Sequence, residues 1–91
     1  MPVVVAGKLA LKPGCREAFI AASRDAIIKA RATEECLDFS VSPDPVDENR
    51  VNIFEKWTSR AALDTFRDSG PDTGLFDMIE SFDIHEHEIS L

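Results

Sequence analysis

Two hydrophobic periodicities alternate along the chain, and this alternation restricts its fold more than any other feature. Apolar and polar residues alternate in residues 36–42 and 82–91, a spacing typical of strands. Residues 3–11 are rich in branched apolar residues, and residues 51–58 place apolar side chains on both faces, so both segments are also predicted strands. Apolar residues recur at every third or fourth position from Pro13 to Ala30 and again from Ser59 to Gly70, a spacing typical of amphipathic helices. The sequence therefore predicts the order strand, helix, strand, strand, helix, strand.

Turn-forming residues separate these segments. Pro13 and Gly14 end the first strand, and Pro13 suits the first position of a helix. Residues 43–49 are polar and interrupted by proline, so we expect a hairpin connection there. Gly70 and Pro71 end the second helix, and apolar residues between 75 and 79 predict a further helical turn or two after Asp72. A chain of 91 residues has room for one domain, residues 1–91.

This order of elements is that of a ferredoxin-like split β-α-β fold. It is an α+β architecture (βαββαβ) in which both helices cover one face of an antiparallel sheet. The other face is left bare, and the third strand carries apolar residues on both of its faces. Because a domain of this size has a small core, we expect a second copy to cover the bare face. The prediction is a homodimer whose two sheets close into a dimeric α+β barrel.

The charge of the chain argues against several classes of partner. Ten basic and seventeen acidic residues give a formal net charge of −7, so neither nucleic acid nor an anionic membrane surface is an expected partner. No apolar run approaches the ~20 residues that span a bilayer, and the N-terminus lacks the positive flank of a secretory signal. Cys15 and Cys36 are too few for a disulfide framework or a zinc site. We expect a cytoplasmic protein with reduced thiols.

Glu55 and Trp57 are the first candidates for a catalytic site. They lie two residues apart on the third predicted strand and therefore on one face of it. Trp57, the only tryptophan, could form the wall of a pocket for a flat substrate or belong to the core. Burial would raise the pKa of Glu55 and suit its carboxylate to accept a phenolic proton. The alternative is a structural role, either a capping contact to backbone N–H groups or an ion pair with Arg24 or Arg60.

His85 and His87 are further catalytic candidates, two residues apart on the last predicted strand. They could relay a proton, or form hydrogen bonds at a subunit interface with Ser40 or Asp38. A His-x-His pair with no third ligand at a recognisable spacing is a weak metal signal, so we expect no metal. The sequence also carries no phosphate loop and no flavin or nicotinamide motif, so we expect no cofactor of these kinds.

Three residues on the middle strands are candidates for contacts with a substrate. Phe39 and Phe54 are aromatic and could line an apolar cavity, although their alternation also fits core or interface positions. Asn52 could hydrogen-bond a substrate or simply pair within the sheet.

The run from Glu55 to Ser59, followed by Ala62 and Leu63, resembles the Glu-x-Trp-x-Ser and Ala-Leu signature of the antibiotic biosynthesis monooxygenase domain family. Residues 9–14, residues 36–37 and the closing strand extend the resemblance over essentially the whole chain. The resemblance implies a dimeric ferredoxin-like barrel. Its oxygenase branch implies a pocket in which the anion of a quinol or polycyclic phenol reacts directly with molecular oxygen, without a cofactor.

The sequence departs from this family at two positions. Members commonly have a histidine in the second helix, nine or ten residues after the tryptophan, where this chain has Phe66 and Arg67. The heme-degrading branch needs that histidine and an asparagine on the first strand, where this chain has Gly7. The departures therefore argue against heme degradation, and Phe66 would make the pocket more apolar.

Three functions remain open at this point. The first is a cofactor-independent monooxygenase acting on a quinol-like or polycyclic phenol. The second is an isomerase or other proton-transfer enzyme with Glu55 or a histidine as the base. The third is a dimer that binds a hydrophobic small molecule without catalysis, which the replacement of histidine by Phe66 favours slightly.

Overall fold

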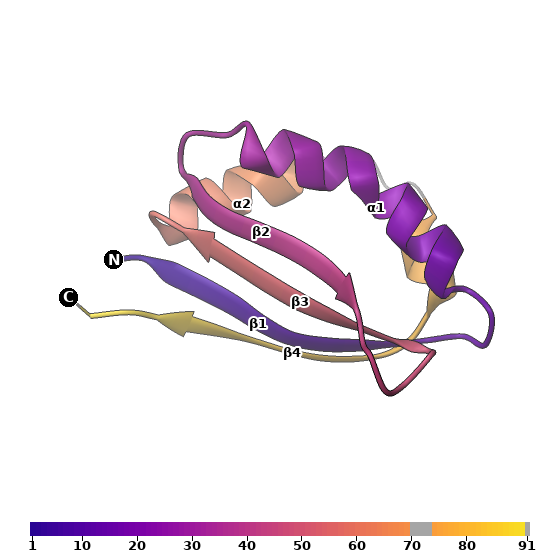
Figure 1. Ribbon diagram of the computed structural model, residues 1–91. Helices are drawn as coiled ribbons and strands as arrows, with labels where there is room; N and C mark the ends of the chain where they lie inside the picture. Colours follow the sequence, from indigo (N-terminus) through magenta and orange to yellow (C-terminus); the bar gives the residue numbers. More distant parts are fainter. Residues whose placement is uncertain (70–73, 91) are drawn as a thin grey trace.

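The computed structural model describes residues 1–69 and 74–90 and confirms the predicted fold (Figure 1). In chain order the elements are β1 (Val3–Leu11), α1 (Arg16–Arg31), β2 (Cys36–Pro43), β3 (Arg50–Trp57), α2 (Arg60–Ser69), the 3₁₀ helix η1 (Leu75–Met78) and β4 (Ile79–Glu88). All strand pairs are antiparallel, in the order β2-β3-β1-β4. Both α-helices cover the same face of this sheet (Figure 1).

The predicted boundaries agree with most of these elements, with two exceptions. The first helix begins at Arg16 and not at Pro13, because Pro13 and Gly14 form a turn and Cys15 is the N-cap residue. The second exception is the last strand. It begins at Ile79, three residues before the predicted start, because Ile79 pairs with Leu11 beyond an irregularity between Ala10 and Leu11. The helical turn predicted here is the short η1. Ser59 caps α2 as its sequence position suggests, since its hydroxyl accepts a hydrogen bond from the Ala62 N–H at 3.2 Å. Gly70, Pro71, Asp72 and Leu91 lie outside the described residues.

The core lies between the sheet and the helices and has two parts. One part packs around the completely buried Trp57 and consists of Val3, Val5, Ala30, Phe39, Trp57 and Leu63. The other part packs around Phe19 of α1 and consists of Leu9, Leu11, Phe19, Val51 and Ile53. Burial of each large apolar side chain stabilises the fold by about 1.5–3 kcal/mol. Among the helices of the described chain, none is long and apolar enough to cross a membrane.

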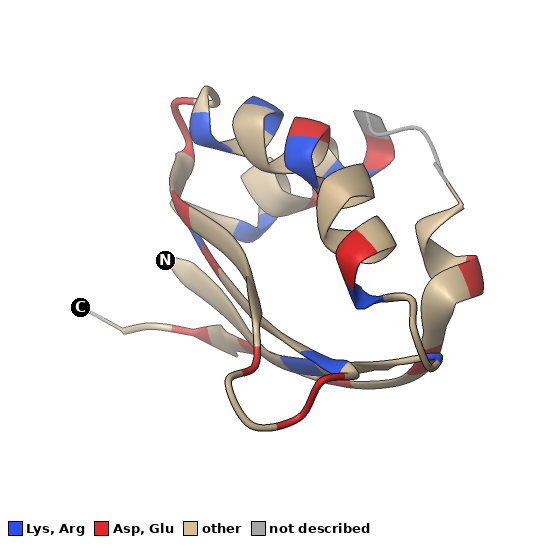
Figure 2. Cartoon of the chain, turned by 45° about the vertical axis from the view of Figure 1, so that its right-hand side comes forward, with Lys and Arg blue, Asp and Glu red and all other residues tan. Residues whose placement is uncertain are grey.

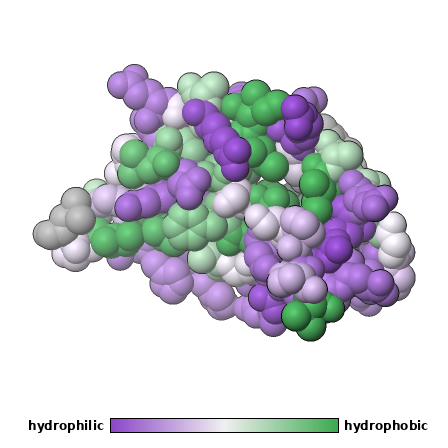
Figure 3. Space-filling model, in the orientation of Figure 1, coloured by the Kyte–Doolittle hydropathy of each residue, from purple (hydrophilic) through white to green (hydrophobic). Residues whose placement is uncertain are grey.

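The open face of the sheet is of mixed character. Phe54 is 38% exposed there, beside the half-buried Val4 and Ala6. Charged and polar side chains lie in the same rows of the sheet, since Lys56 and His87 pair with Val4 and His85 pairs with Ala6. The apolar part of the open face is thus a central patch around Phe54. Outside the open face the surface is mixed as well. Hydrophobic and hydrophilic residues interleave on the side of the molecule seen in Figure 3, and the helices carry both acidic and basic residues (Figure 2).

Gly7 allows β1 and β4 to approach closely. Its φ of +153° lies in a region that residues with side chains rarely adopt. A Cβ at this position would collide with the carbonyl oxygen of Asp83 and lie 2.8 Å from the Cα of Ile84. No residue with a side chain, asparagine included, fits here without moving β4.

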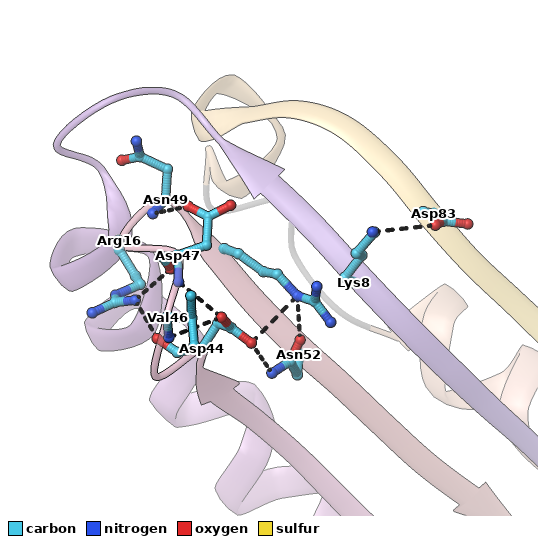
Figure 4. Close-up of polar contacts among 9 residues, drawn as sticks. Lys8, Arg16, Asp44, Val46, Asp47, Asn49, Asn52 and Asp83 are labelled. Atoms are coloured by element: carbon cyan, nitrogen blue, oxygen red, sulfur yellow. Dashed lines mark hydrogen bonds and ion pairs between the residues drawn. The ribbon is translucent and has the colours of Figure 1, made fainter.

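Asp44 organises the connection between β2 and β3 (Figure 4). Its Oδ2 accepts hydrogen bonds from the backbone N–H groups of Val46 at 3.1 Å and Asp47 at 2.9 Å. Its Oδ1 accepts one from the Asn52 amide at 3.0 Å and lies 3.5 Å from the Arg50 guanidinium. These contacts, with the Asn52 hydrogen bond first, lower the pKa of Asp44 to about 2. Asp44 thus acts as a scaffold for the connection.

The low pKa of Asp44 predicts how stability depends on pH. A carboxyl whose pKa falls on folding contributes stability above its unfolded pKa of about 4, and this contribution is lost as the pH falls toward 2. We expect Asp44→Asn to lower the free energy of unfolding at pH 7, with the difference shrinking toward pH 2. Urea denaturation at both pH values measures this, with Asp64→Asn on the exposed surface of α2 as the control. A constant difference at both pH values would contradict the assignment.

Candidate active site

A cavity of about 210 Å³ lies between the sheet, α1 and η1. It opens to solvent beside two aromatic side chains, Phe76 of η1 and Phe82 of β4, which are 63% and 59% exposed. Their ring centroids lie 6.0 Å apart. The wall is almost entirely apolar and is formed by Leu9, Phe19, Ser23, Ala26, Phe39, Val41, Ile53, Glu55, Leu75, Phe76, Ile79, Phe82 and Ile84.

Two residues bring polar side chains to this wall, Ser23 and Glu55. The Ser23 hydroxyl donates a hydrogen bond to the Phe19 carbonyl oxygen at 2.7 Å, so its proton is engaged in a hydrogen bond within α1. Glu55 lies on β3, between Val5 of β1 and Phe39 of β2 in the sheet register, and these neighbours are apolar. Among the described residues of the wall, Glu55 is therefore the titratable one.

The environment of Glu55 makes its carboxylate a stronger base than an ordinary one. Burial raises the pKa of Glu55, because the charged form loses hydration. A hydrogen bond from the Trp57 indole and the positive charge of Arg67 lower the pKa again, and the negative charge of Glu86 raises it. Burial is the largest of these effects, so the pKa remains above its usual value. The predicted rise in the pKa of Glu55 is confirmed.

Trp57 contacts Glu55 from within the core and does not line the cavity. Its Nε1–H donates a hydrogen bond of 3.0 Å to Glu55 Oε1. Its ring is completely buried, edge-on to Phe39 at 6.4 Å and tilted against Phe66 of α2 at 5.0 Å. The interpretation of Trp57 as a pocket wall is therefore wrong for the described cavity, and the core interpretation is right. Phe39 belongs to both places, since it touches this aromatic cluster and lines the cavity.

Asn52, Phe54, His85 and His87 lie on the opposite face of the sheet. Asn52 and Phe54 are offset from Glu55 by an odd number of residues on β3, and β4 pairs the two histidines with Val4 and Ala6 of β1. The structure therefore separates these four predicted residues from the cavity.

Two of these residues, Asn52 and His85, have polar partners on the open face of the sheet. The Asn52 side-chain oxygen accepts a hydrogen bond from Arg50 at 2.7 Å, and its amide binds Asp44. His85 Nε2 lies 2.9 Å from Asp83 Oδ1 on its own strand. Within one chain the histidines lie far from Ser40 and Asp38, because β2 and β4 form opposite edges of the sheet, and the contact across a subunit interface stays a prediction. Within the described residues no group of three or more His, Cys, Asp or Glu side chains could hold a metal ion.

Residues 2–71 match the model of the antibiotic biosynthesis monooxygenase family. The chain belongs to the antibiotic biosynthesis monooxygenase family. It is 41% identical over 63 residues to an uncharacterized protein of Synechocystis sp., an alignment that covers 69% of this chain and 43% of the relative. The chain thus spans less than half the length of that relative.

Several solved structures of similar fold cover nearly the whole chain. A conserved protein of Methanosarcina mazei aligns with a TM-score of 0.84 and 18% identity, covering 99% of this chain and 94% of that protein. A Caulobacter crescentus protein provisionally named an antibiotic biosynthesis monooxygenase aligns with a TM-score of 0.82 and 17% identity, covering 99% and 91%. At these identities the likeness establishes the fold that this family member shares.

The structure adds site residues that sequence reasoning on this monooxygenase family member missed. Ser23 was detectable in principle, since it interrupts the apolar stripe of α1. Phe76 and Phe82 reach the cavity mouth only because η1 leads directly into β4. The alternative ion pair of Glu55 with Arg60 is wrong, because Arg60 binds Glu86 and Glu88 instead.

Proposed function

We propose that this member of the family is a cofactor-independent monooxygenase that oxidises a quinol-like phenol of one or two rings, with Glu55 as the base. One observation carries the proposal: a single carboxylate of raised pKa lies in the wall of an otherwise apolar cavity. A cavity of about 210 Å³ is smaller than the ~300–1,000 Å³ of most drug-sized sites. The size favours a small quinol-like substrate over a polycyclic one.

In the proposed reaction Glu55 accepts the phenolic proton and leaves an electron-rich phenolate in the apolar cavity. One electron passes from the phenolate to O₂, and the two radicals combine at a ring carbon that carries a hydrogen, ortho or para to the phenolate oxygen, to form a C–O bond. The peroxide takes up a proton, and the hydroperoxide then loses the ring-carbon proton and hydroxide as water. The balance is phenol + O₂ → quinone + water, so one oxygen atom enters the product and the other is reduced to water.

Oxygen uptake with single-ring and two-ring phenols tests this proposal. With ¹⁸O₂ we expect one labelled oxygen in the quinone and one in water. Exchange of a substrate C–H proton with deuterated water, without oxygen uptake, would instead assign proton-transfer catalysis to the same carboxylate. Binding without either reaction would leave a non-catalytic ligand-binding protein.

Filling the cavity should abolish substrate binding without unfolding the domain. Ala26 lies on α1 in the cavity wall, so a phenyl ring at position 26 occupies the space of the substrate. We expect Ala26→Phe to weaken binding at least about tenfold, at a stability cost of about 1–3 kcal/mol for overpacking. Fluorescence titration with a redox-inert phenol measures the binding. The control is Ala21→Phe, the same change on the exposed side of α1. Equal binding by both variants would contradict the placement of the site.

The proposal also includes a homodimer joined through the open sheet face. The exposed Phe54, with Val4 and Ala6 half-buried around it, supports this arrangement because it forms an apolar centre surrounded by polar residues. Sedimentation equilibrium at micromolar concentration tests it, and a stable monomer would contradict it.

A further inference from the structure

An ion-pair network ties α2 to the edge strand β4 on the same sheet face as Glu55. Glu86 accepts hydrogen bonds from two arginines of α2, at 2.6 Å from Arg60 Nη1 and 2.9 Å from Arg67 Nη1. Arg60 also contacts Glu88 at 3.3 Å. The two arginines are seven residues apart, which is two helical turns, so both extend toward β4. Arg60 and Arg67 therefore both anchor α2 to β4.

The register of the sheet places Glu86 and Glu55 in one row. Both pair directly with Val5 of β1, Glu86 from β4 and Glu55 from β3. Directly paired residues share a face, so the two carboxylates extend from the helix-covered face with one strand between them. Arg67 acts on both, since it binds Glu86 and its positive charge favours the ionised form of Glu55.

The other neighbours of Glu55 contribute little charge. β1 presents Val5 and β2 presents Phe39, both uncharged. The Cys36 thiol of β2 is neutral at pH 7, because burial raises its pKa. α1 presents Ser23 and Ala26 to the same cavity. The charged groups that act on Glu55 are thus Arg67 from α2 and Glu86 from β4.

We propose that Arg67 is a positioning residue whose guanidinium, bound to Glu86 in the sheet row that also holds Glu55, sets the proton affinity of the cavity base. The inference rests on the proposed role of Glu55 as that base. Arginine stays protonated at all physiological pH values, so Arg67 tunes the carboxylate and takes no part in proton transfer itself. Glu86 opposes this effect, because its negative charge repels a negative charge on Glu55.

Trp57 provides a direct readout of this effect. It is the only tryptophan of the chain, and its indole N–H binds the Glu55 carboxylate. The indole N–H cross-peak in a ¹H–¹⁵N spectrum should therefore shift with pH as Glu55 titrates, without substrate or oxygen. Glu55→Gln should remove this titration and so confirms the assignment of the signal.

Four variants separate charge tuning from simple anchoring of α2. We expect Arg67→Gln to increase the proton affinity of Glu55 roughly three- to tenfold, the size expected of one partly solvated charge at close range. Arg67→Lys should restore most of the difference, and Glu86→Gln should shift the titration in the opposite direction. The matched control is Arg60→Gln, which removes the other arginine bound to Glu86 and should leave the titration nearly unchanged.

The inference is overturned if Arg67→Gln leaves the midpoint unchanged, or if Arg60→Gln shifts it equally. A rise in proton affinity in Glu86→Gln would also contradict the opposing effects of Arg67 and Glu86 on Glu55. These outcomes are independent of the proposed reaction. Absence of oxygen uptake in the parent protein would remove the monooxygenase proposal and leave the measured titrations standing.

Discussion

Replacing Glu55 by Gln is expected to lower the rate of oxygen uptake at least about 100-fold, the usual contribution of a positioned general base. The amide keeps the size of the side chain, and its carbonyl oxygen can still accept the hydrogen bond that Trp57 donates. The variant therefore removes the proton acceptor with little change in shape. Initial rates of oxygen consumption measure the loss. Glu80→Gln, a matched change at an exposed position of β4, is the control.

The stability of the same variant separates a lost base from a damaged fold. When the pKa of a carboxyl rises on folding, the folded protein loses stability as the pH rises from the unfolded pKa through the folded pKa. At neutral pH the charged Glu55 is thus a cost to the fold, and Glu55→Gln should be at least as stable as the parent protein. Activity in the parent should rise with pH through the pKa of Glu55. A stable variant that keeps more than about a tenth of the parent rate would remove Glu55 from its proposed role.

Replacing Gly7 by Ala is expected to destabilise the domain by about 2–5 kcal/mol, because it combines backbone strain with overpacking. The new methyl group would collide with the Asp83 carbonyl and lie close to Ile84, so β4 has to move away from β1. A loss of this size is a large part of the ~5–15 kcal/mol that stabilises a typical domain. Chemical denaturation monitored by the fluorescence of Trp57 measures it.

A second glycine provides the control for the strain. Gly14 also has a positive φ, +79°, but a Cβ there would have no neighbouring atom within 4 Å. Gly14→Ala therefore carries the conformational cost alone, about 1–2 kcal/mol. The excess loss in Gly7→Ala measures the close approach of the two strands. Equal losses in the two variants would contradict a steric role for Gly7.

Local patterns in the sequence were enough to predict the order of the elements and which residues share a face. Alternation on β3 places Glu55 and Trp57 together, and the same parity separates Asn52 and Phe54 from them. The sequence could not show which face of β3 the helices cover, because apolar residues occur on both faces. All four of these β3 residues were therefore reasonable candidates for the site before the pairing register of the strands was known.

Long-range pairing decided what local patterns could not. Glu86 lies in the same row as Glu55 only because both β3 and β4 pair with Val5 of β1. Likewise, Trp57 packs against Phe39 and Phe66, which come from two other elements, and it does not line the cavity. The resemblance drew attention to Gly7 as a missing asparagine. The structure gives a steric reason for glycine at that position.

The nearly hydrocarbon wall of the cavity also bears on inhibitor design. Because Glu55 and Ser23 are the polar groups within it, affinity for a series of aromatic compounds should follow their partition from water into alkane. An unsubstituted bicyclic arene would then act as a competitive inhibitor, because it has no acidic proton that Glu55 could accept. Added hydroxyl groups should increase turnover more than they increase affinity.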